Sequence, residues 1–308
     1  FFYNGGNDSM DTCNKVSKYL LNSGYECNII GVPKTIDNDL YGTDHCPGYG
    51  SAAKYVATTM MELFLDATVY NKGQITIVEI MGRNAGWLTA ASALASYKGQ
   101  GPDLIYLPEQ AFDVEKFLKQ VKEVADKNEG KCIVALSEGI KTADDQYVVE
   151  AIASSSASKD SFGHTQLGGV AATLANLVKE RIGGKVRAVE FSLMQRCGAH
   201  LASKNDVEEA FEAGRTAVRC ACEGYTDKMV VFERKEVDYY AIEYKLMDIE
   251  LAANTEKKIP EEWILPENKG LTQDFVNYAL PLIQGDCKAP LEDGLPRFAK
   301  LKRIKVQD

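Results

Sequence analysis

Apolar residues recur along this chain with two alternating spacings, one typical of helices and one typical of strands. Residues 10–23 carry apolar side chains at helical spacing, and residues 27–33 follow as a short apolar strand. Ser51 is expected to be the N-cap of a long helix to about residue 69, and residues 74–80 resemble another strand. The alternation continues through 103–108 (strand), 113–128 (helix), 132–139 (strand), 167–182 (helix), 185–194 (strand), 206–224 (helix) and 228–234 (strand). This alternation predicts an α/β fold in which a parallel sheet carries helices on its faces.

The chain is long enough for more than one such unit. Its 308 residues, 45% of them apolar, can bury a substantial core, and the usual domain size of roughly 100–200 residues predicts two domains. After about Leu246 the periodicity weakens and prolines become frequent, which indicates irregular turns and short helices. Residues 1–9 resemble a strand that ends in a glycine-rich turn, and they lack an initial methionine. We therefore expect further sequence to precede Phe1.

Net charge and cysteine usage exclude several classes of function. A formal charge of −9 and a pI near 5.1 argue against binding to nucleic acid or to an acidic membrane surface. The sequence shows no run of 18 apolar residues and no secretory signal pattern. Its eight cysteines form no C-x-x-C pair, which favours free thiols and a cytoplasmic location. A small anionic substrate could still bind in a locally basic pocket.

The strand at 27–33 ends in a concentration of charged and polar residues. Lys34 and Thr35 follow the strand, and Asp37 and Asp39 share the next turn. Two carboxylates held close together favour a raised pKa for one of them, so one aspartate could accept a proton while the other binds or orients a metal ion. The alternative is a solvated Asx-turn after Pro33.

A glycine-rich turn at the start of the chain is a second candidate. Gly6, Asn7 and Asp8 follow an aromatic strand and precede a helix, so backbone N–H groups there could hold an anion. Asp8 would repel a phosphate unless a divalent cation lies between them. A plain tight turn is the alternative reading of a Gly-Gly pair.

Three further strands end in residues suited to a phosphate ester. Met81, Gly82 and Arg83 follow the strand at 74–80, and Glu138 follows the strand at 132–137. An arginine alone is usually a surface ion pair, but its planar guanidinium also suits a phosphate monoester. Two more arginines, Arg187 and Arg196, lie in and after the strand at 185–194. Together these residues describe a sugar-phosphate pocket that faces a polyphosphate and its metal ion.

The ordered motifs GGNDS, PKTIDND, MGRNAGW, SEG and R-x₈-R resemble the 6-phosphofructokinase family from Phe1 to about Gly285. The resemblance implies two similar three-layer parallel-sheet domains with the active site in the cleft between them. It places a donor domain at residues 1–50 plus about 195–250, without its N-terminal segment. Residues 51–194 plus about 251–308 would form the fructose 6-phosphate domain.

The resemblance also implies roles for individual residues. Asp37 corresponds to the general base for the 1-hydroxyl of fructose 6-phosphate, and Asp39 supports the base and the metal ion. Arg187 corresponds to a residue that a neighbouring subunit could contribute, which would make a homodimer or homotetramer necessary. The implied contacts to fructose 6-phosphate are Thr35, Asp37, Asp39, Met81, Gly82, Arg83, Glu138, Arg187 and Arg196.

Two positions bear on the phosphoryl donor. ATP-dependent members of the family tend to carry glycine at the positions of Asp8 and Lys34, whereas this pattern is that of pyrophosphate-dependent members. The resemblance implies that Lys34 and Thr35 stabilise charge on the transferred group. Its donor contacts are Gly6, Asn7, Asp8 and Lys34, and its candidate Mg²⁺ ligands are Asn7, Asp8 and Asp39. An ATP-dependent kinase and a non-catalytic regulatory subunit remain the alternatives.

The chain also departs from the family pattern. Asn7 replaces an aspartate that many members use as a metal ligand. Leu193 and Gln74 stand where ATP-dependent relatives have a histidine and an arginine, with Lys72 as a possible substitute for the arginine. His164, in the segment DSFGH, is interpreted as a structural or pocket-lining residue.

Overall fold

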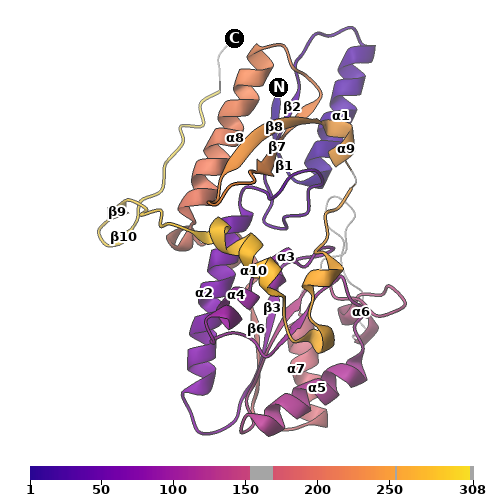
Figure 1. Ribbon diagram of the computed structural model, residues 1–308, viewed down its shortest axis with the longest axis vertical. Helices are drawn as coiled ribbons and strands as arrows, with labels where there is room; N and C mark the ends of the chain where they lie inside the picture. Colours follow the sequence, from indigo (N-terminus) through magenta and orange to yellow (C-terminus); the bar gives the residue numbers. More distant parts are fainter. Residues whose placement is uncertain (153–168, 254, 306–308) are drawn as a thin grey trace.

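The computed structural model describes residues 1–152, 169–253 and 255–305 (Figure 1). The parts of the chain that it describes form two four-stranded sheets, and the ribbon shows them in an upper and a lower lobe. The predicted residues around His164 and the start of the helix expected at 167–182 lie outside these ranges.

The first sheet has the strand order β1-β2-β7-β8. Strands β1, β2 and β7 are parallel, whereas β8 pairs with β7 in the antiparallel direction. Sequence reasoning missed β8, although Ile242, Tyr244 and Leu246 alternate with charged residues and pack on one core, as expected for a half-buried edge strand. The bounds are β1 Phe2–Gly5, β2 Ile30–Pro33, β7 Lys228–Arg234 and β8 Ile242–Asp248.

The second sheet has the order β4-β5-β3-β6, and all its pairings are parallel. Its central strands β3 and β5 are buried along their whole length, which is why they appear in the sequence as mostly apolar runs, with Thr76, Glu79 and Ser137 as the buried polar exceptions. The parallel α/β architecture is thus confirmed. The bounds are β3 Ile75–Ile80, β4 Leu104–Tyr106, β5 Cys132–Ser137 and β6 Val186–Glu190.

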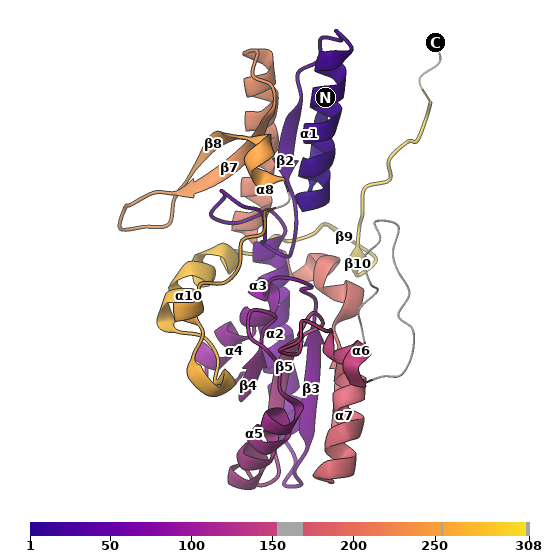
Figure 2. The ribbon, with the colours of Figure 1, turned by 90° about the vertical axis from the view of Figure 1, so that its right-hand side faces the viewer.

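Helices cover both faces of each sheet (Figure 2). In the first sheet Met229 packs in one core with Met10 of α1, whereas the next residue, Val230, packs in another with Ala213 of α8. The second sheet does the same, with α5 and α7 on one face and α2 and α10 on the other. The helices are α1 Asn7–Asn22, α2 Tyr49–Thr68, α3 Trp87–Ala90, α4 Ala93–Tyr97, α5 Val114–Lys127, α6 Val148–Ile152, α7 Val170–Arg181, α8 Lys204–Cys222, α9 Ile249–Ala252 and α10 Gln273–Ala279.

The start of α2 differs from the prediction. The helix begins at Tyr49 after Gly48, so Ser51 lies in its first turn and is not the N-cap. Asp206 of α8 supplies the missing acceptor, because its carboxylate accepts hydrogen bonds from the N–H groups of Gly48 (2.7 Å) and Ser51 (3.0 Å) and from the Ser51 hydroxyl. A helix N-terminus is therefore satisfied by a residue about 155 positions away in sequence, which no local pattern could predict.

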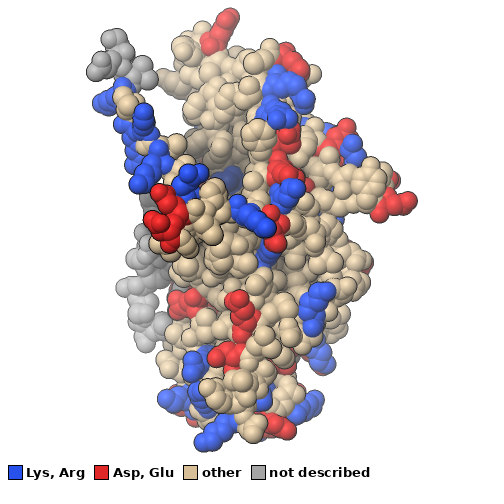
Figure 3. Space-filling model, turned by 90° about the vertical axis from the view of Figure 1, so that its left-hand side faces the viewer, with Lys and Arg blue, Asp and Glu red and all other residues tan. Residues whose placement is uncertain are grey.

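The predicted segment of short helices and turns is present between α9 and the C-terminal residues, where 3₁₀ turns at Glu261–Trp263, Pro266–Asn268 and Leu280–Ile283 flank α10. It is followed by a short hairpin of two strands with two residues each, β9 Leu291–Glu292 and β10 Leu295–Pro296. The C-terminal residues beyond it stand away from the body of the molecule, as Figure 2 shows. The C-terminal segment carries the basic residues Lys300, Lys302, Arg303 and Lys305. On the rest of the face in Figure 3, acidic and basic side chains are interspersed.

Within the ranges that the structure describes, no helix combines the length and apolar character that crossing a membrane requires. All eight cysteines are free thiols.

The strands of the first sheet come from residues 2–33 and 228–248, and those of the second from residues 75–190. The exact domain boundaries given above stay predictions.

Candidate active site

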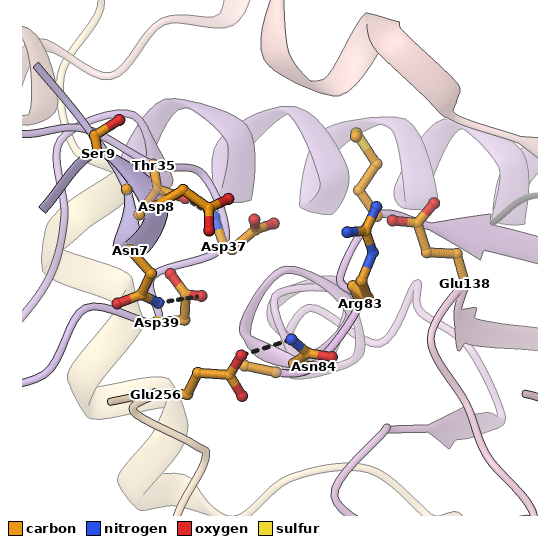
Figure 4. Close-up of a pocket in the computed structure, with 13 residues that line it drawn as sticks. Asn7, Asp8, Ser9, Thr35, Asp37, Asp39, Arg83, Asn84, Glu138 and Glu256 are labelled. Atoms are coloured by element: carbon orange, nitrogen blue, oxygen red, sulfur yellow. Dashed lines mark hydrogen bonds between the residues drawn. The ribbon is translucent and has the colours of Figure 1, made fainter. Parts of the chain in front are cut away.

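The carboxyl ends of four parallel strands meet between the two sheets. Residues after β1 and β2 approach from the first sheet, and residues after β3 and β5 approach from the second. They enclose a cavity of about 350 Å³ (Figure 4). Its lining consists of Gly6, Asn7, Asp8, Ser9, Thr35, Asp37, Asp39, Met81, Arg83, Asn84, Ala85, Glu138 and Glu256. Residues spread over the sequence are thus brought to one place by the topology.

A second cavity, of about 440 Å³, adjoins the first. The two share Thr35, Asp37 and Met81, and the second adds Lys34 and Arg196 among its lining residues. Asp37 therefore lies where the two cavities meet. Asp8 and Lys34, which were considered together in sequence, line different cavities on either side of it.

Two of the predicted substrate residues do not line these cavities. Gly82 is buried behind the first cavity, where its N–H group donates a hydrogen bond to Glu138 (3.3 Å). Arg187 lies on the edge strand β6 with an exposed side chain and lines neither cavity. In this geometry Arg187 does not contact a sugar phosphate bound in the cavities of its own chain.

Asp37 has the environment of a tunable base. Its backbone N–H group donates to the Thr35 hydroxyl at 3.1 Å. Burial raises the pKa of its carboxyl group, and the positive charges of Arg83, Lys34 and Arg196 oppose that shift. Burial and neighbouring cations thus act in opposite directions on one carboxylate at the meeting point of the cavities.

Asp39 is the more strongly perturbed of the two acids. Burial raises its pKa to about 7, with further contributions from the negative charges of Asp37 and Glu256. The Asn7 amide donates a hydrogen bond to its carboxylate at 2.9 Å, which Figure 4 draws as a dashed line. Both acids therefore have raised pKa values, mainly through burial, and the charge repulsion that the sequence indicated adds to this effect for Asp39.

We expect Asp39 to make stability depend on pH in the absence of metal ions. A carboxyl group whose pKa rises from 3.8 in the unfolded chain to about 7 in the folded one destabilises the fold once it ionises. Asp39→Asn removes this titrating group. Between pH 5 and pH 8 the free energy of unfolding of the parent should therefore fall by about 2–3 kcal/mol more than that of Asp39→Asn. Urea unfolding of both proteins at these two pH values, with a chelator present, measures this difference. Equal pH slopes for the two proteins would contradict the expectation.

The oxygen atoms of this cavity suit a magnesium ion. The side-chain oxygen of Asn7 is buried and has no hydrogen-bond partner among the described residues, and the carboxylates of Asp8 and Asp39 line the same cavity. In the described ranges, no cluster of three or more Asp, Glu, His or Cys side chains could enclose a metal ion. Mg²⁺ commonly takes only one or two protein carboxylates and completes its coordination with water and substrate phosphates. The residues present fit that mode of binding.

The loops that carry Arg83 and Glu138 are packed against each other through a glycine. A Cβ atom on Gly139 would lie 1.9 Å from the backbone oxygen of Arg83. Gly82 has a φ of +143°, a conformation that residues with a side chain rarely adopt. Glycine at these positions allows Arg83 and Glu138 to face the same cavity.

Gly139→Ala is therefore expected to displace the Arg83 loop and to lower kcat/KM for the phosphorylated sugar about 10- to 100-fold, since small misplacements of binding groups are costly. Steady-state kinetics measures the loss. Gly214→Ala is the matched control, because the glycine lies on α8 with no atom within 4 Å of the added methyl group. An unchanged kcat/KM for Gly139→Ala would show that the loop tolerates the displacement.

Sequence reasoning missed Glu256, which lines the first cavity and accepts a hydrogen bond from the Asn84 amide at 2.5 Å. Glu256 lies in the irregular segment after α9, so it had no periodic pattern or motif to mark it. Gln195 was also missed; it is buried beside Arg196, and its side-chain oxygen accepts the N–H group of Met81 at 3.2 Å. Only its position next to a predicted arginine could have suggested it.

Comparison with known proteins settles the family. Residues 1–206 match the family described as Phosphofructokinase. The chain belongs to this family. It is 41% identical to the pyrophosphate–fructose 6-phosphate 1-phosphotransferase of Halomonas elongata, an alignment that covers 100% of the chain and 73% of that protein. Identity to the protein of the same name from Xanthomonas campestris is 44%, with 99% of the chain and 73% of that protein covered.

A solved structure of this phosphofructokinase family supports the same placement. The crystal structure of the pyrophosphate-dependent phosphofructokinase from Marinobacter aquaeolei superimposes with a TM-score of 0.87 and 40% sequence identity. The superposition covers 100% of this chain and 73% of that one. The phosphofructokinase fold expected from the motifs is thereby confirmed, whereas the division into two similar domains stays a prediction.

Proposed function

We propose that the chain catalyses reversible phosphoryl transfer from pyrophosphate to the 1-hydroxyl of fructose 6-phosphate, giving fructose 1,6-bisphosphate and phosphate. The observation that carries this proposal is the place of Asp37, at the junction of two cavities and within electrostatic reach of Arg83, Lys34 and Arg196. The names of the relatives from Halomonas elongata and Xanthomonas campestris support the same reaction.

Asp37 acts as the general base in this proposal. It accepts the proton of the sugar hydroxyl while that oxygen attacks the terminal phosphorus of the donor, and the bond from phosphorus to the bridging oxygen breaks. A base works best when its pKa lies near the working pH, and burial moves the pKa of Asp37 in that direction. The neighbouring cations oppose this shift and favour the ionised carboxylate, which is the form that accepts a proton.

Cationic side chains bind the phosphates and stabilise charge. Arg83 and Glu138 line the first cavity, and Arg196 lines the second, so guanidinium groups are available on both sides of Asp37. Lys34 lies on the Arg196 side and can neutralise negative charge on the transferred group or the leaving phosphate. Catalysis of phosphoryl transfer rests mainly on such positioning and charge stabilisation.

Asn7, Asp8 and Asp39 would hold Mg²⁺, which neutralises charge on the pyrophosphate oxygens when bound. Asp8 also limits the donor. Its carboxylate adds bulk and negative charge beside the glycine turn, so a short inorganic donor is accommodated more readily than a nucleotide. In this proposal Arg187 contacts the sugar phosphate bound by a neighbouring subunit of a homodimer or homotetramer. Its exposed position on β6 is in keeping with that role.

A donor assay tests the function. The protein is incubated with fructose 6-phosphate and either Mg-pyrophosphate or Mg-ATP, and formation of fructose 1,6-bisphosphate is followed. Turnover with pyrophosphate at least 100-fold above that with ATP supports the proposal. Preference for ATP would assign the chain to the ATP-dependent kinases, and binding of fructose 6-phosphate without turnover would indicate a regulatory subunit.

A further inference from the structure

A short segment after α9 connects the two sides of the active site. We call residues 255–259 the strap. After α9, which lies against the first sheet, the chain passes to the lower lobe, as Figures 1 and 2 show. Sequence reasoning gave this segment no role, and the proposed reaction uses none of its residues except as lining of the cavity. Its contacts nevertheless reach both catalytic loops.

Lys257 holds the loop that carries the two acids. Its N–H group donates to the backbone oxygen of Asp39 at 2.7 Å, and its ammonium group donates to the backbone oxygens of Thr43 (3.2 Å) and Asp44 (2.7 Å). Leu40 and Glu256 add a β-bridge. One lysine therefore contacts the loop at its beginning and its end.

The same lysine contacts the loop that follows Arg83. Its backbone oxygen accepts the indole N–H of Trp87 at 2.8 Å, and its ammonium lies 4.9 Å from the centre of the Trp87 ring. The neighbouring Glu256 accepts the Asn84 amide at 2.5 Å, an interaction that Figure 4 shows across the lower side of the cavity. The strap thus touches loops that belong to different sheets.

A third contact anchors the far end of the strap. One carboxylate oxygen of Glu109 accepts both the N–H of Gly86 (2.9 Å) and the N–H of Ile259 (3.3 Å). The Arg83 loop and the strap are therefore joined at both ends of the segment 84–87. A displacement of the strap cannot leave this loop unaffected.

We propose that Lys257 is a positioning residue, which holds the loop of Asp37 and Asp39 in register with the loop of Arg83 across the cavity. In the proposed reaction Asp37 must reach the hydroxyl of a sugar that Arg83 helps to bind, so the separation of the two loops affects the rate. This inference rests on the proposed function for the consequences on turnover. The connection between the loops stands on the contacts alone.

The ammonium group is the part of Lys257 that a substitution can test. Lys257 is half-buried, and burial lowers the pKa of its amine while the thiol of Cys46 and the charges of Asp44 and Asp39 act in the opposite direction. Arg234 is the positive group that also faces it. Lys257→Met keeps the length and apolar stem but removes the ammonium donor from the backbone oxygens of Thr43 and Asp44, of which the Asp44 oxygen keeps the Tyr278 hydroxyl as a donor. Lys258→Met is the matched control, because Lys258 is the next residue of the strap and is exposed.

Hydrogen exchange of the whole protein tests the connection independently of activity. In Lys257→Met, amides within residues 39–46 and 84–87 are expected to exchange at least 10-fold faster, while Lys258→Met leaves both segments as in the parent. Exchange that is unchanged in both segments of Lys257→Met overturns the proposal. This measurement decides the matter even if the parent has no activity with pyrophosphate, an outcome that would overturn only the proposed function.

Steady-state kinetics distinguishes positioning from simple stability. For Lys257→Met we expect kcat to fall about 10- to 100-fold while KM for fructose 6-phosphate changes less than about threefold, because every group that contacts the sugar is still present but the loop of the base is no longer aligned with the loop of Arg83. Circular dichroism at the assay temperature confirms that the variant is folded. A kcat per folded molecule equal to that of the parent, alongside faster exchange, would reduce Lys257 to a structural residue and overturn the proposal.

Discussion

Asp37→Asn is expected to lower kcat by about 10³- to 10⁴-fold, because the amide cannot accept the proton of the attacking hydroxyl. KM for fructose 6-phosphate should change less than about threefold, since Arg83, Glu138 and Arg196 keep their places in the two cavities. The initial rate of fructose 1,6-bisphosphate formation, measured over a range of sugar concentrations, gives both constants. The variant differs from the parent by one exchanged atom, so changes in packing should be small.

The stability of the same variant provides its control. Burial raises the pKa of Asp37 above its unfolded value, so ionised Asp37 destabilises the fold at neutral pH. Asp37→Asn should therefore unfold at an equal or higher urea concentration than the parent at pH 7.5. Full activity in this variant would remove Asp37 from the mechanism. Lost activity together with lost stability would point to a disturbed fold and not to a missing base.

Lys34→Gly is expected to reduce pyrophosphate-driven kcat by about 10²- to 10³-fold, the range found when a group that stabilises transition-state charge is removed. The exposed side chain of Lys34 makes a loss of stability small. The measurement is turnover with saturating fructose 6-phosphate at varied Mg-pyrophosphate. Lys98→Ala is the control for the loss of one positive charge, because Lys98 is exposed and lines neither cavity.

The double variant Asp8→Gly, Lys34→Gly tests the choice of donor. Removing the carboxylate and the ammonium gives both positions the residue that ATP-dependent relatives tend to have, so measurable turnover with Mg-ATP should appear while pyrophosphate activity stays low. Because Asp8 and Lys34 line different cavities that meet at Asp37, their effects on pyrophosphate activity should be nearly additive. A double variant that retains pyrophosphate activity and rejects ATP would contradict the assignment of both residues.

Much of the site could be predicted because the relevant signals are local. Mostly apolar runs identify the buried strands β3 and β5, and the residues that follow a parallel strand must lie at the carboxyl edge of its sheet. Asp37, Arg83 and Glu138 were found in this way and line one cavity. The spacing of the two aspartates indicated only the electrostatic part of the raised pKa of Asp39, because burial is its largest cause.

Other features could not be predicted because they depend on how distant elements pack. The alternation in β8 marks a half-buried strand, but only the packed sheet shows that it pairs with β7 in the antiparallel direction. Asp206 caps α2 from another helix, and Glu256 reaches the cavity from a segment without periodicity. Lys34 and Asp8 were considered one set, and only the three-dimensional arrangement separates them.

The sequence by itself therefore determined the alternation of strands and helices, the family, and the chemical groups that gather at the strand ends, since these depend on short-range periodicity and turn chemistry. The tertiary structure alone decided which of those groups face each other and that Lys257 joins the loops of both sheets. The reason is physical. Contacts such as that between Trp87 and Lys257 join residues 170 positions apart, and they form only after both sheets have packed.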